Sequence, residues 1–298
     1  MKSAIRSTVR WRLQGLPLSP AAAEAWADRA KAWPAILDDS AISRMVTLPH
    51  DVQMQVGLVD HIERQLWLHK EWDRPVQTVL ESLLKPGDTY CDLGANIGYF
   101  TLMASRLVGP GGCVIAVEPS TRALRKLTSH LWLNRCHNVL LMSCAVGDVR
   151  GYSALQLATE SNIGGSGVAT EQSIEAMERI WIVPLDELLH GGIAAPKLIK
   201  LDLEGYELRA LQGAIRTIEA ARPWIICEVT ERLLTKFEGT TGQLFELLLQ
   251  RGYQPHVSRL RDDKLCWNPT TAAECTVAAQ EDVLFVPAGQ SVQAVSAA

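Results

Sequence analysis

From residue 87 onward, short apolar runs alternate with segments in which apolar residues recur every three or four positions. Apolar runs of this kind predict buried strands, and the helical spacing predicts amphipathic helices. Strands separated by helices predict an α/β fold with a doubly wound, mostly parallel seven-stranded sheet, Rossmann-like in its layers. The expected strands are 89–93, 113–118, 139–146, 196–203, 224–229, 253–257 and 282–286, and the expected helices are 99–108, 120–133, 206–218 and 241–250.

The segment 1–75 follows a different pattern. Ser19 and Pro20 fit the N-cap and the first position of a helix that runs to Trp33. After it, loose alternation predicts one or two short strands, and helical spacing predicts two helices before the first buried strand. We expect this accessory segment to cover a substrate or to form an oligomer contact, such as that of a homodimer. The short strands are expected within 44–58, the helices at 60–72 and 76–84, the main domain at 76–290 and a disordered tail at 291–298.

Composition and charge exclude several classes of protein. The chain has 298 residues, of which 47% are hydrophobic and 21% are charged, as in a folded globular protein. Its net charge of −4 argues against a large basic surface for nucleic acid. No run of 18 apolar residues occurs in the sequence, so we expect no membrane span. The seven cysteines include no C-x-x-C pair, which favours reduced thiols in a cytoplasmic protein.

The strongest chemical signal is the turn Asp92-Leu93-Gly94-Ala95-Asn96-Ile97-Gly98, which follows the first buried strand. Glu118 ends the next strand. A doubly wound sheet binds nucleotide-like ligands at this place. A dinucleotide would require G-x-G-x-x-G, but Asn96 and Tyr99 stand where the second and third glycines are needed. This disfavours a nicotinamide-dependent oxidoreductase.

S-adenosylmethionine fits the same turn better, because it has no phosphate and carries an ammonium and a carboxylate. We expect Asp92 to orient or attract its cationic end, and Gly94 to leave room for the ribose and the methionine chain. Gly98 would permit tight helix packing. Glu118 would accept hydrogen bonds from the ribose hydroxyls.

These motifs, taken in order, resemble the FkbM-type methyltransferases. The resemblance covers about residues 57–257 and rests on the turn above, Val117-Glu118-Pro119, Ala145-Val146-Gly147-Asp148, Leu185-Asp186-Glu187-Leu188, Ile199-Lys200-Leu201-Asp202-Leu203-Glu204-Gly205-Tyr206-Glu207 and Arg222-Pro223-Trp224-Ile225-Ile226-Cys227-Glu228. It implies a class I methyltransferase that moves a methyl group from S-adenosylmethionine, commonly to hydroxyls of sugars, polyketides or other secondary metabolites. The products would be a methyl ether and S-adenosylhomocysteine. Methylation of a nitrogen, or a non-catalytic S-adenosylmethionine-binding protein of the same fold, is the alternative.

The resemblance also assigns residues. A small-molecule or glycan acceptor would be bound beside the cofactor. Asp148 would face the adenine, with a simple turn acid as the alternative. Glu71 would help to close the cofactor pocket, with a helix-surface acid as the alternative. Carried over by position, the cofactor-binding residues are Glu71, Asp92, Gly94, Asn96, Gly98, Glu118, Pro119, Asp148 and Asp202.

A second group of carboxylates, Asp202, Glu204 and Glu228, follows the fourth and fifth strands. Carboxyl ends of parallel strands meet at one edge of a sheet, so we expect these side chains to converge. One of them could be the general base for a hydroxyl acceptor. Asp202 and Glu228 could instead hold a divalent metal, which we do not favour. In a third reading, Asp202 orients the methyl donor and Glu204 caps the helix that begins at Tyr206.

Two further features are candidates for the acceptor side. His69 is a candidate base in the segment that leads into the first motif, although a solvated or packed histidine is the more common state. The loop 161–167 is a candidate substrate lid, with a plain hairpin as the alternative.

Overall fold

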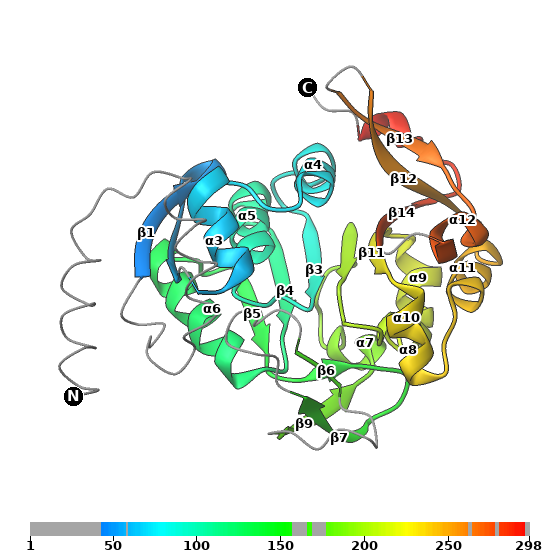
Figure 1. The fold of residues 1–298 in the computed structure, drawn as a ribbon, viewed down its shortest axis with the longest axis horizontal. Helices are drawn as coiled ribbons and strands as arrows, with labels where there is room; N and C mark the ends of the chain where they lie inside the picture. The colour runs from blue at the N-terminus through cyan, green and yellow to red at the C-terminus, as the bar shows by residue number, and fades with distance from the viewer. Residues whose placement is uncertain are drawn as a thin grey trace. The chain divides into compact units, whose positions relative to one another are not determined.

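The computed structural model describes residues 43–57, 59–156, 166–168, 177–261, 264–277 and 280–295 (Figure 1). The chain divides into two compact units, and the described residues up to Trp72 belong to the first and those from Asp73 onward to the second. The expected helix 19–33 lies outside the described residues, as do residues 161–165 of the candidate lid.

The first unit contains a hairpin and one helix. Strands β1 (Ser43–Leu48) and β2 (Val52–Gly57) pair antiparallel around the 3₁₀ turn η2 (Pro49–Asp51), so the loose alternation in this segment does correspond to two short strands. Helix α3 (His61–His69) begins because the Asp60 side chain accepts a hydrogen bond from the amide of Glu63 at 3.0 Å. It ends at Lys70, which has a φ of +62°.

The second unit is built on an eight-stranded sheet. Five neighbouring strands are parallel, and three at one edge are antiparallel. The doubly wound α/β prediction is confirmed, but the sheet has one strand more than expected and is mixed. The strands, in their order across the sheet, are β13 (Lys264–Pro269), β12 (Tyr253–Arg261), β14 (Glu281–Pro287), β11 (Trp224–Val229), β10 (Leu198–Leu201), β3 (Thr89–Leu93), β4 (Cys113–Val117) and β5 (Val139–Met142).

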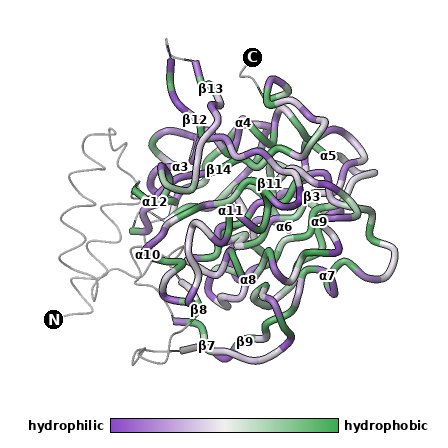
Figure 2. The backbone as a smooth tube through the Cα atoms, turned by 90° about the vertical axis from the view of Figure 1, so that its right-hand side faces the viewer, coloured by the Kyte–Doolittle hydropathy of each residue, from purple (hydrophilic) through white to green (hydrophobic). Residues whose placement is uncertain are grey.

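Strand β13 was missed because it lies at the edge of the sheet. Only Leu265 and Trp267 in it are buried, so it has no continuous apolar run of the kind that marks the central strands. Figure 2 shows the same contrast: the central strands are largely hydrophobic, and the β12–β13 hairpin is mostly hydrophilic.

Helices cover both faces of this sheet. Alternate residues of a strand point to opposite faces, so Cys91 and Leu93 pack in the cluster that includes Leu211 and Phe245, while Asp92 points to the other face, toward α5. The helices are α4 (Arg74–Leu83), α5 (Tyr99–Val108), α6 (Thr121–Asn134), α7 (Leu185–Leu188), α8 (Glu207–Gln212), α9 (Ile215–Ala221), α10 (Glu231–Leu234), α11 (Thr241–Leu249) and α12 (Ala272–Val277), with 3₁₀ turns η4 (Thr235–Phe237) and η5 (Val292–Ala294).

The helix expected at 206–218 is wrong as a single element, because it divides into α8 and α9 at Gly213. A Cβ atom at this glycine would lie 1.9 Å from the carbonyl oxygen of Gly147, so the chain passes close to another backbone here. Within the described part of the segment after residue 290, η5 forms and Val295 is buried.

The second unit also contains a smaller, separate sheet of four strands. Its strands are β6 (Ala145–Val146), β9 (Met177–Val183), β7 (Gly151–Gln156) and β8 (Gly167–Val168), in that order. The strand expected at 139–146 is therefore wrong: β5 stays in the main sheet and β6 enters the smaller one. The apolar pattern does not show this break, because apolar residues occur both in β5, which is only half-buried, and in buried β6.

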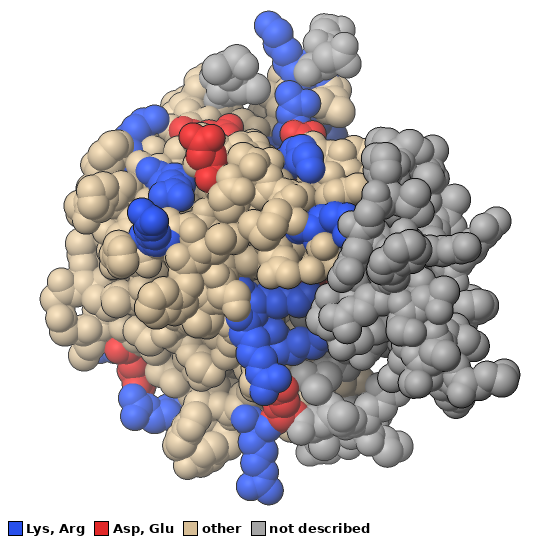
Figure 3. All heavy atoms as spheres, turned by 90° about the vertical axis from the view of Figure 1, so that its left-hand side faces the viewer, with Lys and Arg blue, Asp and Glu red and all other residues tan. Residues whose placement is uncertain are grey.

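Charge is distributed unevenly over the surface. Helix α6 carries Arg122, Arg125 and Lys126 and no acidic residue. The face shown in Figure 3 displays more Lys and Arg than Asp and Glu. Among the described residues, no helix is both long and apolar enough to cross a membrane.

Candidate functional site

The turn after β3 is folded tightly against β4 and β10. The amides of Gly94 and Ala95 both donate to the carbonyl oxygen of Val117, at 2.9 and 3.0 Å. Gly94 has a φ of +82°, and a Cβ atom there would lie 1.9 Å from the carbonyl oxygen of Asp202. Glycine is therefore required both by the backbone angle and by the space.

Gly98 closes the same turn and begins α5. It has a φ of +96°, and a Cβ atom would lie 2.3 Å from Cδ1 of Leu127 in α6. The glycine therefore lets the two helices approach each other closely.

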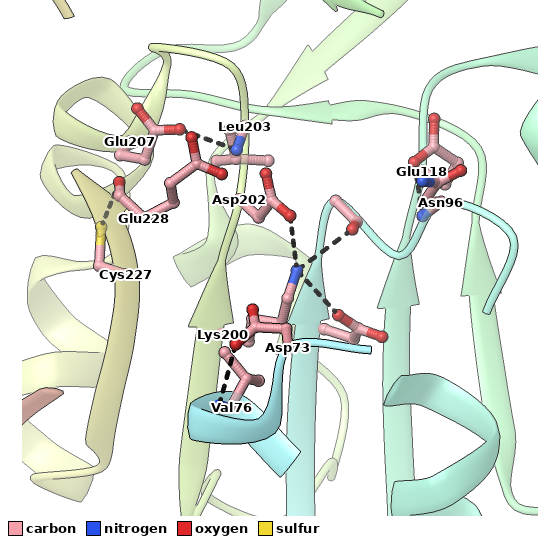
Figure 4. A network of polar contacts seen from close by, with 12 residues as sticks. Asp73, Val76, Asn96, Glu118, Lys200, Asp202, Leu203, Glu207, Cys227 and Glu228 are labelled. Atoms are coloured by element: carbon pink, nitrogen blue, oxygen red, sulfur yellow. Dashed lines mark hydrogen bonds and ion pairs between the residues drawn. The ribbon is translucent and has the colours of Figure 1, made fainter. Parts of the chain in front are cut away.

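Glu118 is fixed at the end of β4, beside this turn. Its Oε2 accepts from the Asn96 amide at 2.9 Å, and its Oε1 accepts from the Ser120 amide at 2.8 Å. The side chain is 7% exposed, and burial raises its pKa to about 7, although the two amide bonds oppose the shift. Asn96 has a φ of +48°, and its Oδ1 is buried without a hydrogen-bond partner among the residues that the structure describes. Figure 4 shows both residues at the turn, and half-buried Pro119 follows them.

Asp92 and Asp202 face the same buried lysine. Lys200 Nζ lies 3.3 Å from Asp202 Oδ2 and 3.8 Å from Asp92 Oδ1. Asp92 is 1% exposed and its Oδ2 accepts from the Thr101 hydroxyl at 2.6 Å. Burial raises the pKa of Asp92, and Lys200 and Thr101 counteract that shift. The side chain of Asp202 is 41% exposed, so it is open on the side away from Lys200.

Three carboxylates form a row across three neighbouring strand ends. The β10–β11 register pairs Leu201 with Cys227, so Asp202 and Glu228 follow at the same level, and Glu228 is paired with Asp282 of β14. In Figure 4 the Glu228 carboxylate points toward Asp202. Burial, and next the negative charge of Asp202, raise the pKa of Glu228 to about 10. Burial likewise raises the pKa of Asp282 well above its usual value.

Sequence analysis missed two of the carboxylates near this row. Asp282 stands near the start of an apolar strand, and an acid in that position was the available signal. Asp73 caps α4: it accepts from the Val76 amide at 3.3 Å, and Pro75 follows it at the start of the helix. Burial raises the pKa of Asp73 to about 6, and Asp202 adds to the shift.

Glu204 lies in the turn after β10, in the left-handed backbone region with a φ of +54°. Burial, and next the charge of Asp202, raise its pKa to about 7, while Lys236 and Arg232 act in the opposite direction. The reading in which Glu204 caps the following helix is wrong. The carboxylate that holds this turn belongs to Glu207, whose Oε1 accepts from the amides of Leu203 at 2.8 Å and Gly205 at 3.1 Å.

The remaining candidates are placed elsewhere. Asp148 follows β6 in the smaller sheet, and its Oδ2 accepts from Arg209 at 3.2 Å. His69 ends α3 and Glu71 follows it, so both belong to the first unit and their assigned roles stay predictions. Within the part of the chain that the structure describes, no three His, Cys, Asp or Glu side chains are grouped so that they could hold a metal ion.

The sequence of this chain matches the methyltransferase FkbM domain over residues 92–255, which is more than half of its length. The chain belongs to the FkbM methyltransferase family. The match begins at the acid before the Gly94 turn and ends in β12, so it includes both turns and two carboxylates of the row, Asp202 and Glu228.

Similar proteins include the 31-O-demethyl-FK506 methyltransferase FkbM of Streptomyces tacrolimicus. It is 26% identical to this FkbM-family chain over 199 residues, which are 57% of this chain and 74% of that protein. A methyltransferase FkbM structure from Methylobacillus flagellatus KT has a TM-score of 0.43 and 18% identity, covering 87% of this chain and 65% of that chain. An S-adenosylmethionine-dependent O-methyltransferase structure from Thermotoga maritima has a TM-score of 0.41 and 10% identity, covering 83% and 79%.

Proposed function

We propose that this FkbM-family chain transfers a methyl group from S-adenosylmethionine to a hydroxyl group of a small-molecule or glycan acceptor. The observation that carries the proposal is the pair formed by the Gly94 turn and Glu118. A carboxylate held by two backbone amides at the end of β4 is oriented in advance to accept from a ribose diol. The name of the Streptomyces tacrolimicus relative, an O-demethyl-FK506 methyltransferase, supports a hydroxyl on a natural-product scaffold.

The charges around the turn also fit this cofactor. Three carboxylates, those of Asp92, Asp202 and Asp73, interact with one cation, Lys200, in the described part of the chain. The excess of negative charge favours a ligand that carries positive charge. The buried, unpartnered Oδ1 of Asn96 offers a further acceptor at the turn. S-adenosylmethionine supplies a methyl group on a positively charged sulfur, which is already activated for transfer. The work left for the protein is to align the acceptor and to exclude water.

Glu204 is our candidate for the general base. A base is most effective when its pKa lies near the working pH, and the pKa of Glu204 is raised to about 7. Its carboxylate would take the hydroxyl proton of the acceptor. Burial and the charge of Asp202 raise the pKa of Glu228 further above its usual value, so we assign the role of base to Glu204 and not to Glu228. Asp202, ion-paired with Lys200, is assigned to orienting the methyl donor.

Methylation of an amine is the second candidate function. The half-exposed carboxylate of Asp202 favours it, because a negative charge attracts a protonated amine to the acceptor side. A cytoplasmic location is also proposed, on the cysteine usage noted above.

The test is calorimetric titration with S-adenosylhomocysteine of the wild type, Glu118→Gln and a matched control, Glu187→Gln. Glu187 lies in the short helix α7 and forms an ion pair with the exposed Arg150. Loss of a charged hydrogen bond costs about 2 kcal/mol, so Glu118→Gln should bind about 30-fold more weakly. The control should bind like the wild type. Absence of binding to the wild type would contradict the proposal.

A second assay identifies the acceptor class. Release of S-adenosylhomocysteine is measured with hydroxylated acceptors and with matched amines in place of the hydroxyl. Turnover of hydroxyl acceptors supports O-methylation, and turnover of the amines alone would replace it with N-methylation.

A further inference from the structure

Lys200 is a buried cation beside the two turns of the candidate site. It lies in β10, opposite Asp92 of β3 in the register of the sheet, and is 5% exposed. Its ammonium reaches three oxygen atoms from two segments: Asp202 Oδ2 at 3.3 Å, the Gly94 carbonyl oxygen at 3.5 Å and Asp92 Oδ1 at 3.8 Å. Figure 4 shows the three contacts radiating from Nζ.

The neighbouring charges keep this lysine protonated. Burial by itself lowers the pKa of a lysine, but the charges of Asp202 and Asp92 outweigh burial and raise the pKa of Lys200 above its usual value. The ring of Phe100, in the first turn of α5, lies 5.5 Å from Nζ and adds a cation–π contact. Among the described residues, Lys200 is the one cation in ion-pair contact with both Asp92 and Asp202.

The contacts of Lys200 join two turns that already touch. The Asp202 amide donates to the Leu93 carbonyl oxygen at 3.1 Å, and the absent Cβ of Gly94 makes room for the Asp202 backbone. The side chain of Asp202 contacts Lys200 and also shares a hydrogen bond with the side chain of Glu228. Of these two partners, Lys200 is the one that also contacts the Gly94 carbonyl oxygen, so it links this half-exposed carboxylate to the first turn.

We propose that Lys200 is a positioning residue of the methyl-donor site. Its ammonium contacts both the Asp202 carboxylate and the Gly94 carbonyl oxygen, and it thereby fixes the two turns between which the donor binds. This inference rests on the proposed function.

The alternative is that Lys200 only neutralises the buried charge of Asp92. Thr101→Val separates the two roles, because Thr101 is the other partner of Asp92 and touches neither Asp202 nor Gly94. We therefore compare Lys200→Met, Thr101→Val, Asp202→Asn and the double variant Lys200→Met/Asp202→Asn. Each is measured for S-adenosylhomocysteine affinity by calorimetry and for melting temperature without ligand.

If Lys200 acts through Asp202, Lys200→Met should weaken affinity by about tenfold or more, and by no more than about twofold in the Asp202→Asn background. Thr101→Val should lower the melting temperature while its affinity stays within about threefold of the wild type. If Lys200→Met does not fold, we compare Asp92→Asn with the double variant Asp92→Asn/Lys200→Met. Neither of these variants carries the buried negative charge of Asp92, so the loss of Lys200 no longer leaves that charge unpaired.

The outcomes are separable. A wild type that binds S-adenosylhomocysteine, together with a Lys200→Met variant that binds equally well, overturns this inference alone. Equal losses of affinity in Lys200→Met and Thr101→Val, or full additivity of Lys200→Met with Asp202→Asn, also overturn it. A wild type that does not bind overturns the proposed function and this inference with it.

Discussion

Substitution of Gly94 by alanine tests the close approach of the two turns. Two other glycines provide matched controls. Gly87 has a φ of +95° with no atom within 4 Å of an added Cβ, so Gly87→Ala introduces backbone strain without a clash. Gly111 has open space and no positive φ, so Gly111→Ala introduces neither. Comparison of the three variants therefore separates the cost of backbone strain from the cost of steric overlap.

The expected magnitudes follow from the geometry. A positive φ costs an alanine about 1–2 kcal/mol, which is the whole effect expected for Gly87→Ala. At Gly94 the new Cβ would also meet the Asp202 carbonyl oxygen at 1.9 Å, a backbone atom that moves only with β10. Overpacking of this kind adds about 1–3 kcal/mol, so Gly94→Ala should lose about 2–5 kcal/mol. Gly111→Ala should be neutral or gain up to about 1 kcal/mol.

The assay is equilibrium unfolding in guanidinium chloride followed by circular dichroism, with S-adenosylhomocysteine affinity measured in parallel. Gly94→Ala should also lose affinity, because relief of the overlap displaces Asp202. A difference in unfolding free energy between Gly94→Ala and Gly87→Ala of less than about 1 kcal/mol would refute the reasoning, since overlap then adds nothing to strain.

Four further predictions concern three single side chains. Glu204→Gln should reduce turnover by about 100-fold or more. The wild-type rate should rise with pH through about 7, because the base then loses its proton. If the rate of the variant rises with pH in the same way, Glu204 is not the base. The pKa of Glu204 is higher in the folded than in the unfolded chain, so the native state binds more protons between pH 4.5 and 7. The free energy of unfolding should therefore fall as the pH rises through this range. Denaturant titrations should show a smaller fall for Glu204→Gln than for the wild type. Glu228→Gln imitates the protonated acid and should keep turnover within about threefold near pH 7; a loss of about 100-fold would restore Glu228 as the base. Ser120→Ala removes the N-cap acceptor of the Ala123 amide and should lower the unfolding free energy by about 1 kcal/mol, and no change in thermal melting would count against the cap.

Local pattern was sufficient for most elements of the second unit. Helix α5 has the predicted bounds, and the N-cap of α6 at Ser120 follows from a polar residue directly before an apolar helical pattern. Two of the failures share one cause. The break between β5 and β6, and the one at Gly213 between α8 and α9, depend on which distant segment each piece packs against.

The candidate site shows the same division. The glycines and acids of the Gly94 turn and Glu118 could be read from the sequence, because a strand, a turn and a helix define their positions locally. Asp73 and Asp282 could not, since they reach the site from a helix cap and from an antiparallel strand about 200 residues apart in the chain.

By itself, therefore, the sequence determined the alternation of strands and helices, the family and the acids beside the Gly94 turn, all of which depend on neighbouring residues and their spacing. Tertiary structure decided how far the pKa of each carboxylate is raised. Glu204 and Glu228 are the same amino acid, yet burial and the charge of Asp202 raise their pKa values to about 7 and about 10. The physical reason is that desolvation and Coulomb interaction depend on distances through space, which the order of residues does not contain.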